Sequence, residues 1–219
     1  MKKEKKRIPP SHYFWIFLIA SVIGTYYEEI LHIIYHAIKY HEFDYSRRSG
    51  LFWGPLSPVY GFGAALFLFL LGRKERGKMK TFAWAAILGG VAEYAMSVIQ
   101  EIVTGTTSWD YSDKFLNIHG RTTVIYMLYW GVAGLILIVW LYPQLAKLLS
   151  KIPEKIFHPV TGILFALCLV DILISWTALA RNEMKEKGIP AYTFIGKFYD
   201  EHFDEEYIRK RYPNMEEND

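Results

Sequence analysis

Long apolar runs separated by short clusters of charge make up most of this chain of 219 residues. A helix that crosses the hydrocarbon core of a membrane needs about 20 consecutive apolar residues. Several runs approach that length, and they lack the regularly spaced charges of the amphipathic helices in a soluble domain. The pattern predicts an all-α fold, a polytopic bundle of about five transmembrane helices. The expected spans are Phe14–Tyr35, Phe52–Gly72, Thr81–Val103, Thr122–Leu141 and Pro159–Leu179.

The composition becomes polar after the fifth run. We therefore expect a transmembrane domain over residues 1–181 and a polar C-terminal tail over residues 182–219. Apolar residues recur every four positions in the tail, which predicts a short amphipathic helix lying on the membrane surface or on the protein's own outer face. These residues are Ile195, Tyr199, Phe203 and Tyr207.

Lysine and arginine concentrate in alternate connections, and such segments normally face the cytoplasm. They are the N-terminal tail, the connection between the second and third spans, and the connection between the fourth and fifth. Their basic residues are Lys2, Lys3, Lys5, Lys6 and Arg7, then Arg73, Lys74, Arg76, Lys78 and Lys80, then Lys147, Lys151 and Lys155. We predict a cytoplasmic N-terminus and, with an odd number of spans, a C-terminus outside.

The overall composition narrows the range of partners. The chain is 52% hydrophobic and carries a formal net charge of only +3, which gives no indication of nucleic-acid binding. Its one cysteine, Cys168, lies in an apolar run, so the sequence contains neither a disulfide framework nor a cysteine-based metal site. Membrane lipids are the expected surroundings, and a homo-oligomer is an open alternative to a monomer.

Acidic residues within the spans are the first candidates for function, because a carboxylate inside a membrane is costly. Glu93, Ser97 and Glu101 follow at i, i+4 and i+8 and so share one helix face. Other polar residues within spans are Thr25, Glu28, Glu29, His32 and His36 in the first and Asp171 in the fifth. We expect the stripes of the first and third spans to face each other. Alternatively, Arg48 or Arg121 neutralises these carboxylates and only ties helices together.

Two connections predicted to lie outside carry further polar residues, one from Phe43 to Gly63 and one from Thr107 to Arg121. Pro55 and Pro58 should unwind the start of the second span, and irregular backbone at membrane depth is tolerated only against protein or water. We therefore expect a polar, partly wet cavity in the outer half of the protein. The polar and aromatic residues concerned are Asp44, Arg47, Arg48, Trp109, Asp110, Tyr111, Asp113, Asn117, His119 and Arg121.

Two short motifs resemble cofactor sites without completing them. The run from Gly72 to Met79 matches a phosphate-binding loop except at its last position, where Met79 lacks the hydroxyl that binds magnesium. Glu29 and His32 have the Glu-x-x-His spacing of di-iron sites, and His36 adds an i, i+4 pair, but no second Glu-x-x-His follows. We predict no cofactor and assign no metal ligands, with these histidines at the outer interface, and metal binding by Glu29, His32 and His36 is left as an open alternative.

Two longer motifs resemble those of a bacterial membrane-protein family. The first is GTYYE from Gly24 followed by RSGLFWGPLSPVYGFG from Arg48. The second comprises Glu93, Tyr94, Ser97, Glu101, Trp109, Asp110, Tyr111, Ser112, Asp113, Phe115, Asn117, Gly120, Arg121, Trp130 and Gly131. From Gly24 to Pro143 the chain is similar to the putative ABC-transporter type IV proteins, or CmpB-like permeases. The family usually has Asn-Arg before glycine where this chain has Arg47-Arg48-Ser49-Gly50, which leaves open which arginine carries the family role.

The resemblance implies a multi-pass protein of the bacterial plasma membrane. Because the sequence contains no ATPase of its own, a role in an ABC transporter would require a separate ATPase subunit as partner.

These observations favour a small permease-like protein that binds a polar or amphipathic solute in an outward-facing cavity. The candidate binding residues are Glu28, Arg48, Tyr60, Glu93, Ser97, Glu101, Trp109, Asp110, Tyr111, Asp113, Asn117, His119 and Arg121. Their carboxylates could relay protons or contact a cationic group, and the arginines could hold a carboxylate or phosphate.

Two alternatives stay open. One is a membrane-embedded enzyme acting on a lipid or lipid-linked substrate at the outer leaflet, with Glu101, Asp110, Asp113 and His119 as acid–base or metal-binding residues. The other is a non-catalytic assembly or sensory subunit.

Overall fold

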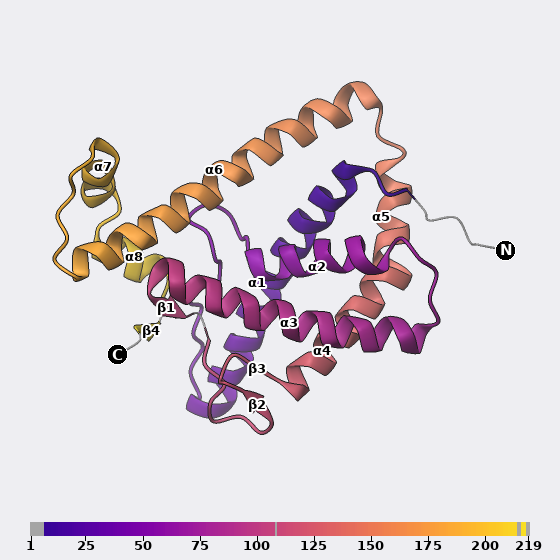
Figure 1. Ribbon diagram of the computed structural model, residues 1–219, viewed down its shortest axis with the longest axis horizontal. Helices are drawn as coiled ribbons and strands as arrows, with labels where there is room; N and C mark the ends of the chain where they lie inside the picture. The colour runs from indigo at the N-terminus through magenta and orange to yellow at the C-terminus, as the bar shows by residue number, and fades with distance from the viewer. Residues whose placement is uncertain (1–6, 108, 214–215, 218–219) are drawn as a thin grey trace. The chain divides into compact units, whose positions relative to one another are not determined.

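The structure, a computed structural model, describes residues 7–107, 109–213 and 216–217. Four of the lysines on which the predicted orientation rests lie outside these residues, namely Lys2, Lys3, Lys5 and Lys6. Helices make up most of the described residues (Figure 1). They are α1 (Pro10–Tyr40), α2 (Pro58–Leu71), α3 (Lys78–Thr104), α4 (Val124–Ile136), α5 (Tyr142–Leu149), α6 (Glu154–Glu186), α7 (Phe194–His202) and α8 (Glu205–Arg211), with a π-helical segment, η1 (Leu137–Leu141), joining α4 to α5. The strands are β1 (Thr106–Thr107), β2 (Asn117–Ile118), β3 (Thr122–Thr123) and β4 (Glu216–Glu217).

The predicted all-α membrane fold is confirmed. In the described part of the chain, 4 helical segments are long and apolar enough to cross a membrane, namely α1, α3, the continuous rod Val124–Leu149 and α6. The remaining predicted span is α2, an apolar helix of 14 residues. At 1.5 Å per residue it is about 21 Å long, which is shorter than a typical hydrocarbon core.

The second span starts later than predicted, at Pro58 instead of Phe52. Proline suits the first turn of a helix, where its missing N–H would have no partner in any case. Ahead of it, Gly54 has φ of +69°, a left-handed conformation that interrupts helical geometry. The predicted unwinding before α2 is therefore present, and it shortens this span.

The chain folds into two compact units. The first comprises Met1–Ser21, Pro58–Met96 and Asp110–Leu167, and the second comprises Val22–Ser57, Ser97–Trp109 and Cys168–Asp219. Helices α1, α3 and α6 each contribute one part to each unit. The core of the first unit contains Ile16, Phe67, Leu68, Ala85 and Leu137.

Polar contacts hold together one end of the first unit. The Arg73 Nε donates to the Tyr13 hydroxyl at 3.3 Å, near the start of α1. The His12 ring lies 3.1 Å from the Tyr142 hydroxyl, and the indole of Trp15 donates to Thr161 on α6 at 3.0 Å. The start of α1, the α2–α3 connection and the α5–α6 region therefore share one end of this unit, and these are the segments that the sequence marks as basic.

The second unit is organised around the irregular segment Ser49–Ser57. Arg211, on α8, is 7% exposed and its guanidinium donates to backbone oxygens of this segment: to Phe52 at 2.7 Å, to Gly54 at 3.2 Å, and to Leu51. The Phe52 ring packs against Phe203, Tyr207 and Tyr212 of the C-terminal tail. The tail therefore covers this segment instead of extending freely from α6.

Helix α6 satisfies the same segment from its other side. The backbone N–H of Phe52 donates to the Ser175 hydroxyl at 2.8 Å, and that of Trp53 donates to Asp171 Oδ1 at 3.3 Å. In addition, β1, which follows α3, pairs antiparallel with β4 at the end of the tail. The α1–α2 connection, the segment after α3 and the C-terminal tail thus share one side of the second unit.

The tail departs from a single amphipathic helix. Asp204, between α7 and α8, caps α8 by accepting a hydrogen bond from the Tyr207 backbone N–H. Tyr199, Phe203 and Tyr207 pack on the apolar cluster of the second unit, whereas Ile195 is 61% exposed. The four-residue repeat therefore marks a face that is largely buried against the protein.

Replacing Arg211 by alanine should loosen the tail. The change leaves buried carbonyl oxygens without their donors, which should destabilise the second unit by about 2–3 kcal/mol. A lower melting temperature in detergent and faster proteolysis of the tail would report this. Arg209→Ala is the matched control, because Arg209 lies on the same helix and is exposed. Equal melting temperatures for the two variants would contradict the role given to Arg211.

Candidate functional site

Glu93, on α3, is the buried carboxyl of the first unit, with 6% of its surface exposed. Its Oε2 accepts a hydrogen bond from the Thr122 hydroxyl at 2.7 Å, and its Oε1 accepts one from the Tyr111 hydroxyl at 3.3 Å. The Trp130 side chain is a third hydrogen-bonding neighbour. An ionised carboxylate offers about four acceptor positions, so these partners leave room for a donor from a ligand.

The loop after residue 109 is held in shape by hydrogen bonds from its own polar side chains. Asp110 Oδ1 accepts hydrogen bonds from the Ser112 backbone N–H at 2.8 Å and hydroxyl at 2.7 Å, which lower the pKa of this carboxyl below its ordinary value. The Asn117 amide donates to two carbonyl oxygens of the loop and accepts from the Gly120 N–H at 3.1 Å. Gly120 has φ of +68°, where a side chain would be strained. Asp110 and Asn117 thus shape the loop that presents Tyr111.

Other residues of this loop lie along α3 or face outward. His119 Nδ1 is 2.9 Å from the Tyr94 hydroxyl, and the Arg121 guanidinium lies 5.9 Å from the centre of the Tyr94 ring, within cation–π reach. Asp113 is exposed and lies 3.2 Å from Lys114 Nζ. The loop is therefore attached to α3 through Tyr94 as well as Glu93.

A cavity of about 470 Å³ lies within the first unit, and Glu93 is the one carboxyl in its wall. Tyr60, another predicted site residue, packs its ring 5.6 Å from that of Trp130 in the same wall. The lining residues are Tyr13, Val59, Phe62, Gly63, Ala65, Leu66, Phe69, Gly89, Ala92, Glu93, Ala95, Met96 and Trp130. This lining is mainly apolar, whereas the sequence led us to expect a polar cavity.

A second polar cluster lies in the second unit, around Arg48. Its guanidinium donates to the His32 ring, its backbone N–H donates to Glu29 Oε1 at 3.3 Å, and Glu28 lies close enough to attract its charge. Burial lowers the pKa of Arg48 from its ordinary value, while Glu28 and Asp44 oppose this shift. Hydrogen bonds from Ser46 and His32 hold the pKa of the Asp44 carboxyl well below its ordinary value.

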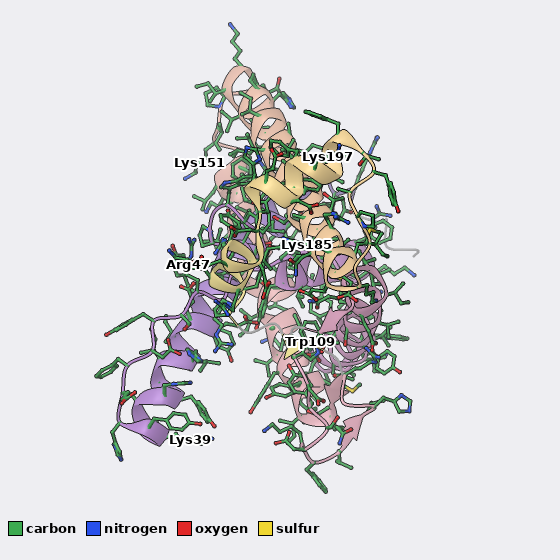
Figure 2. All side chains as sticks on the ribbon, turned by 90° about the vertical axis from the view of Figure 1, so that its left-hand side faces the viewer. Lys39, Arg47, Trp109, Lys151, Lys185 and Lys197 are labelled. Carbon is green, nitrogen blue, oxygen red and sulfur yellow. The ribbon has the colours of Figure 1, made fainter. Side chains whose placement is uncertain are left out.

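The structure separates the two arginines that the sequence could not distinguish. Arg48 faces the cluster of histidines and carboxylates, whereas Arg47 is exposed. Figure 2 shows Arg47 beside α8, where its charge acts on Arg211 and, together with burial, lowers the pKa of that guanidinium. Within the second unit, Arg48 is therefore the arginine that could contact a ligand at the carboxylates of α1.

The predicted site residues divide between the two units. Tyr60, Glu93, Asp110, Tyr111, Asp113, Asn117, His119 and Arg121 belong to the first, and Glu28, Arg48, Ser97, Glu101 and Trp109 belong to the second. In the second unit Ser97 is buried, and Glu101 and Trp109 are half-buried. A single cavity lined by all of these residues stays a prediction.

Sequence reasoning missed two residues that complete the surroundings of Glu93. The apolar pattern places Thr122 at the start of a span, yet its hydroxyl donates to the carboxyl at 2.7 Å. Trp130 enters the sequence argument only through the family motif, although its ring forms part of the cavity wall. The signal that could have identified them is a hydrogen-bond donor in an apolar run, available to pair with a carboxylate on another span.

The family comparison agrees with the motifs. The family model of the putative ABC-transporter type IV proteins matches residues 15–176. The chain belongs to this family. No curated protein and no solved structure matches it. Family membership and the long apolar helices together indicate a membrane protein related to transport, and the ABC-transporter class suggests an ATPase partner.

The cavity wall depends on a close approach between α3 and α4 that Gly89 makes possible. A Cβ atom at this position would overlap the Trp130 side chain. Gly89→Ala should therefore displace Trp130 and lower stability by about 1–3 kcal/mol, as overpacking does. A lower melting temperature in detergent and a shift in tryptophan fluorescence would show it.

Gly162→Ala is the matched control, because Gly162 also lies within a helix and a Cβ there would meet nothing within 4 Å. Alanine at this position should leave the melting temperature unchanged or raise it slightly, since alanine favours helix over glycine. The packing argument would be refuted by equal effects at the two positions.

Proposed function

We propose that this protein is a permease-like membrane protein that binds an amphipathic, positively charged solute in the cavity of the first unit. The observation that carries the proposal is one buried carboxyl, Glu93, in an otherwise mainly apolar wall. The apolar part of the solute would lie against Phe62, Met96 and Trp130, and its positive group would face Glu93. A volume of about 470 Å³ lies within the usual range for small-molecule sites, roughly 300–1,000 Å³.

The carboxyl in the wall favours a cationic solute over a neutral lipid, because a positive group beside it stabilises its ionised form. A lipid acyl chain could fill the apolar space, but it would make no use of a carboxyl inside a membrane protein, where acidic groups are costly to keep. Tyr111 and Thr122 hold the carboxyl in a fixed place, so it is oriented before a ligand arrives.

The remaining features of the proposal follow from the sequence. The protein would reside in a bacterial plasma membrane. Its N-terminus would be cytoplasmic because the basic segments share one end of the first unit, and an odd number of spans would put the C-terminal tail outside. Energy for active transport would come from a separate ATPase subunit, which the family suggests.

Binding of ethidium, an amphipathic cation that becomes more fluorescent on leaving water, tests whether the Glu93 carboxyl attracts a positively charged solute. Glu93→Gln keeps the shape of the side chain and one acceptor oxygen, but it replaces the other oxygen by an NH2 donor and removes the charge. The variant should bind ethidium about tenfold more weakly in detergent, since loss of about 1.4 kcal/mol corresponds to a factor of ten. The measurement is a fluorescence titration of the purified, full-length protein.

Two further variants sharpen the result. Glu154→Gln removes an exposed carboxylate at the start of α6, outside the cavity wall, and should leave the affinity unchanged. Ala92→Leu narrows the cavity without changing its charge and should also weaken binding. Wild-type affinity in both Glu93→Gln and Ala92→Leu would rule out the cavity as the binding site.

A further inference from the structure

A cluster of two histidines and an aspartate lies at the carboxyl end of α1, an end that Lys39 marks in Figure 2. His32 and His36 are one helical turn apart, so their rings project from one face, with ring centres 4.2 Å from each other. Asp44 comes from the segment that follows the helix. The ligand atoms of these three side chains all lie within 4.8 Å of one another.

The chain directs Asp44 toward the histidines. After α1 ends at Tyr40, His41 adopts a left-handed conformation with φ of 58°, which reverses the chain. Asp44 Oδ1 then accepts hydrogen bonds from the Ser46 backbone N–H at 2.9 Å and hydroxyl at 2.5 Å. The other oxygen, Oδ2, lies 2.7 Å from His32 Nε2 and 3.9 Å from His36 Nδ1.

We propose that His32, His36 and Asp44 bind a divalent transition-metal ion, with zinc as the best match. Two imidazoles and one carboxylate suit zinc and other first-row transition metals better than magnesium or calcium. Zinc bonds of about 2.0–2.2 Å in a tetrahedral site place ligand atoms roughly 3.3–3.5 Å apart. The distances from Asp44 Oδ2 to the two rings lie on either side of this value, so small side-chain rotations would close the site around an ion, with water as the fourth ligand.

Arg48 lies where it would compete with a metal ion for the proposed ligands. Its guanidinium donates to His32 Nδ1, lies 3.2 Å from the Nε2 atom that faces Asp44, and its charge interacts with Asp44. A positive group therefore already lies beside the same ligands, and a metal ion would have to displace it. The buried Nε of Arg48 has no hydrogen-bond partner, so less is lost when the side chain moves. Removal of this arginine should then strengthen metal binding. If the cluster were only a structural ion pair, the same change would not create tight metal binding.

Zinc titration of the purified full-length protein in detergent, in competition with a chromophoric chelator, tests the site. We expect one zinc ion per chain, at least about tenfold weaker binding in His36→Ala and in Asp44→Asn, and tighter binding in Arg48→Gln. His158→Ala is the matched control, because His158 lies on α6 outside the cluster, and its affinity for zinc should equal that of the wild type. Magnesium should not compete.

Cobalt(II) in place of zinc provides a second readout. Its absorption spectrum should show the strong visible bands of a four-coordinate site, and these should disappear in His36→Gln, a variant chosen to preserve folding if alanine does not. Wild-type zinc affinity in His36→Ala, or a cobalt spectrum like that of the hydrated ion, would overturn the proposal. Neither outcome bears on ethidium binding in the first unit, so the two proposals fail separately.

Discussion

The hydrogen bonds that Arg211 donates to the segment Ser49–Ser57 solve a problem that every membrane protein with irregular backbone has to solve. A buried carbonyl or N–H group without a partner costs about 1–3 kcal/mol, and lipid offers no donor or acceptor. Here the donor comes from 159 positions away, and the hydroxyl of Ser175 accepts from the Phe52 N–H across 123 positions. The tail and α6 are held to this segment because its backbone would otherwise be unsatisfied.

The same constraint explains the surroundings of Glu93. A carboxyl inside a span is tolerable when donors are brought to it, and the loop after residue 109 supplies them. That loop holds its own shape through Asp110 and Asn117, so Tyr111 and Thr122 reach the carboxyl from fixed positions. In the first unit a loop thus satisfies a polar group of a helix, and in the second unit side chains of α6 and α8 satisfy polar groups of an irregular segment.

The sequence predicted features that depend on long patterns, such as the spans and the grouping of basic segments. It was less accurate for helix boundaries and side-chain roles that single contacts determine. Apolar length alone located the spans, and the charge pattern grouped the segments that share one end of the first unit. It predicted unwinding at Pro55 and Pro58 but placed the start of the second span at Phe52, because the left-handed turn at Gly54 does not show in the hydrophobicity pattern. It did not show that Asp110 and Asn117 bond their own loop, because polarity alone does not distinguish such a side chain from one that faces a ligand. Arg211 was missed for a similar reason: its burial depends on a docking partner far away in sequence.

The two polar clusters differ in a way that bears on how each could work. Glu93 has fixed hydrogen-bond donors around it, and no cation among these partners, so a positively charged ligand meets a site that is already arranged. The cluster of His32, His36 and Asp44 instead has Arg48 beside it, and an incoming metal ion would compete with that resident charge. Competition of this kind weakens binding and makes it reversible, because part of the binding free energy is spent in displacing the arginine.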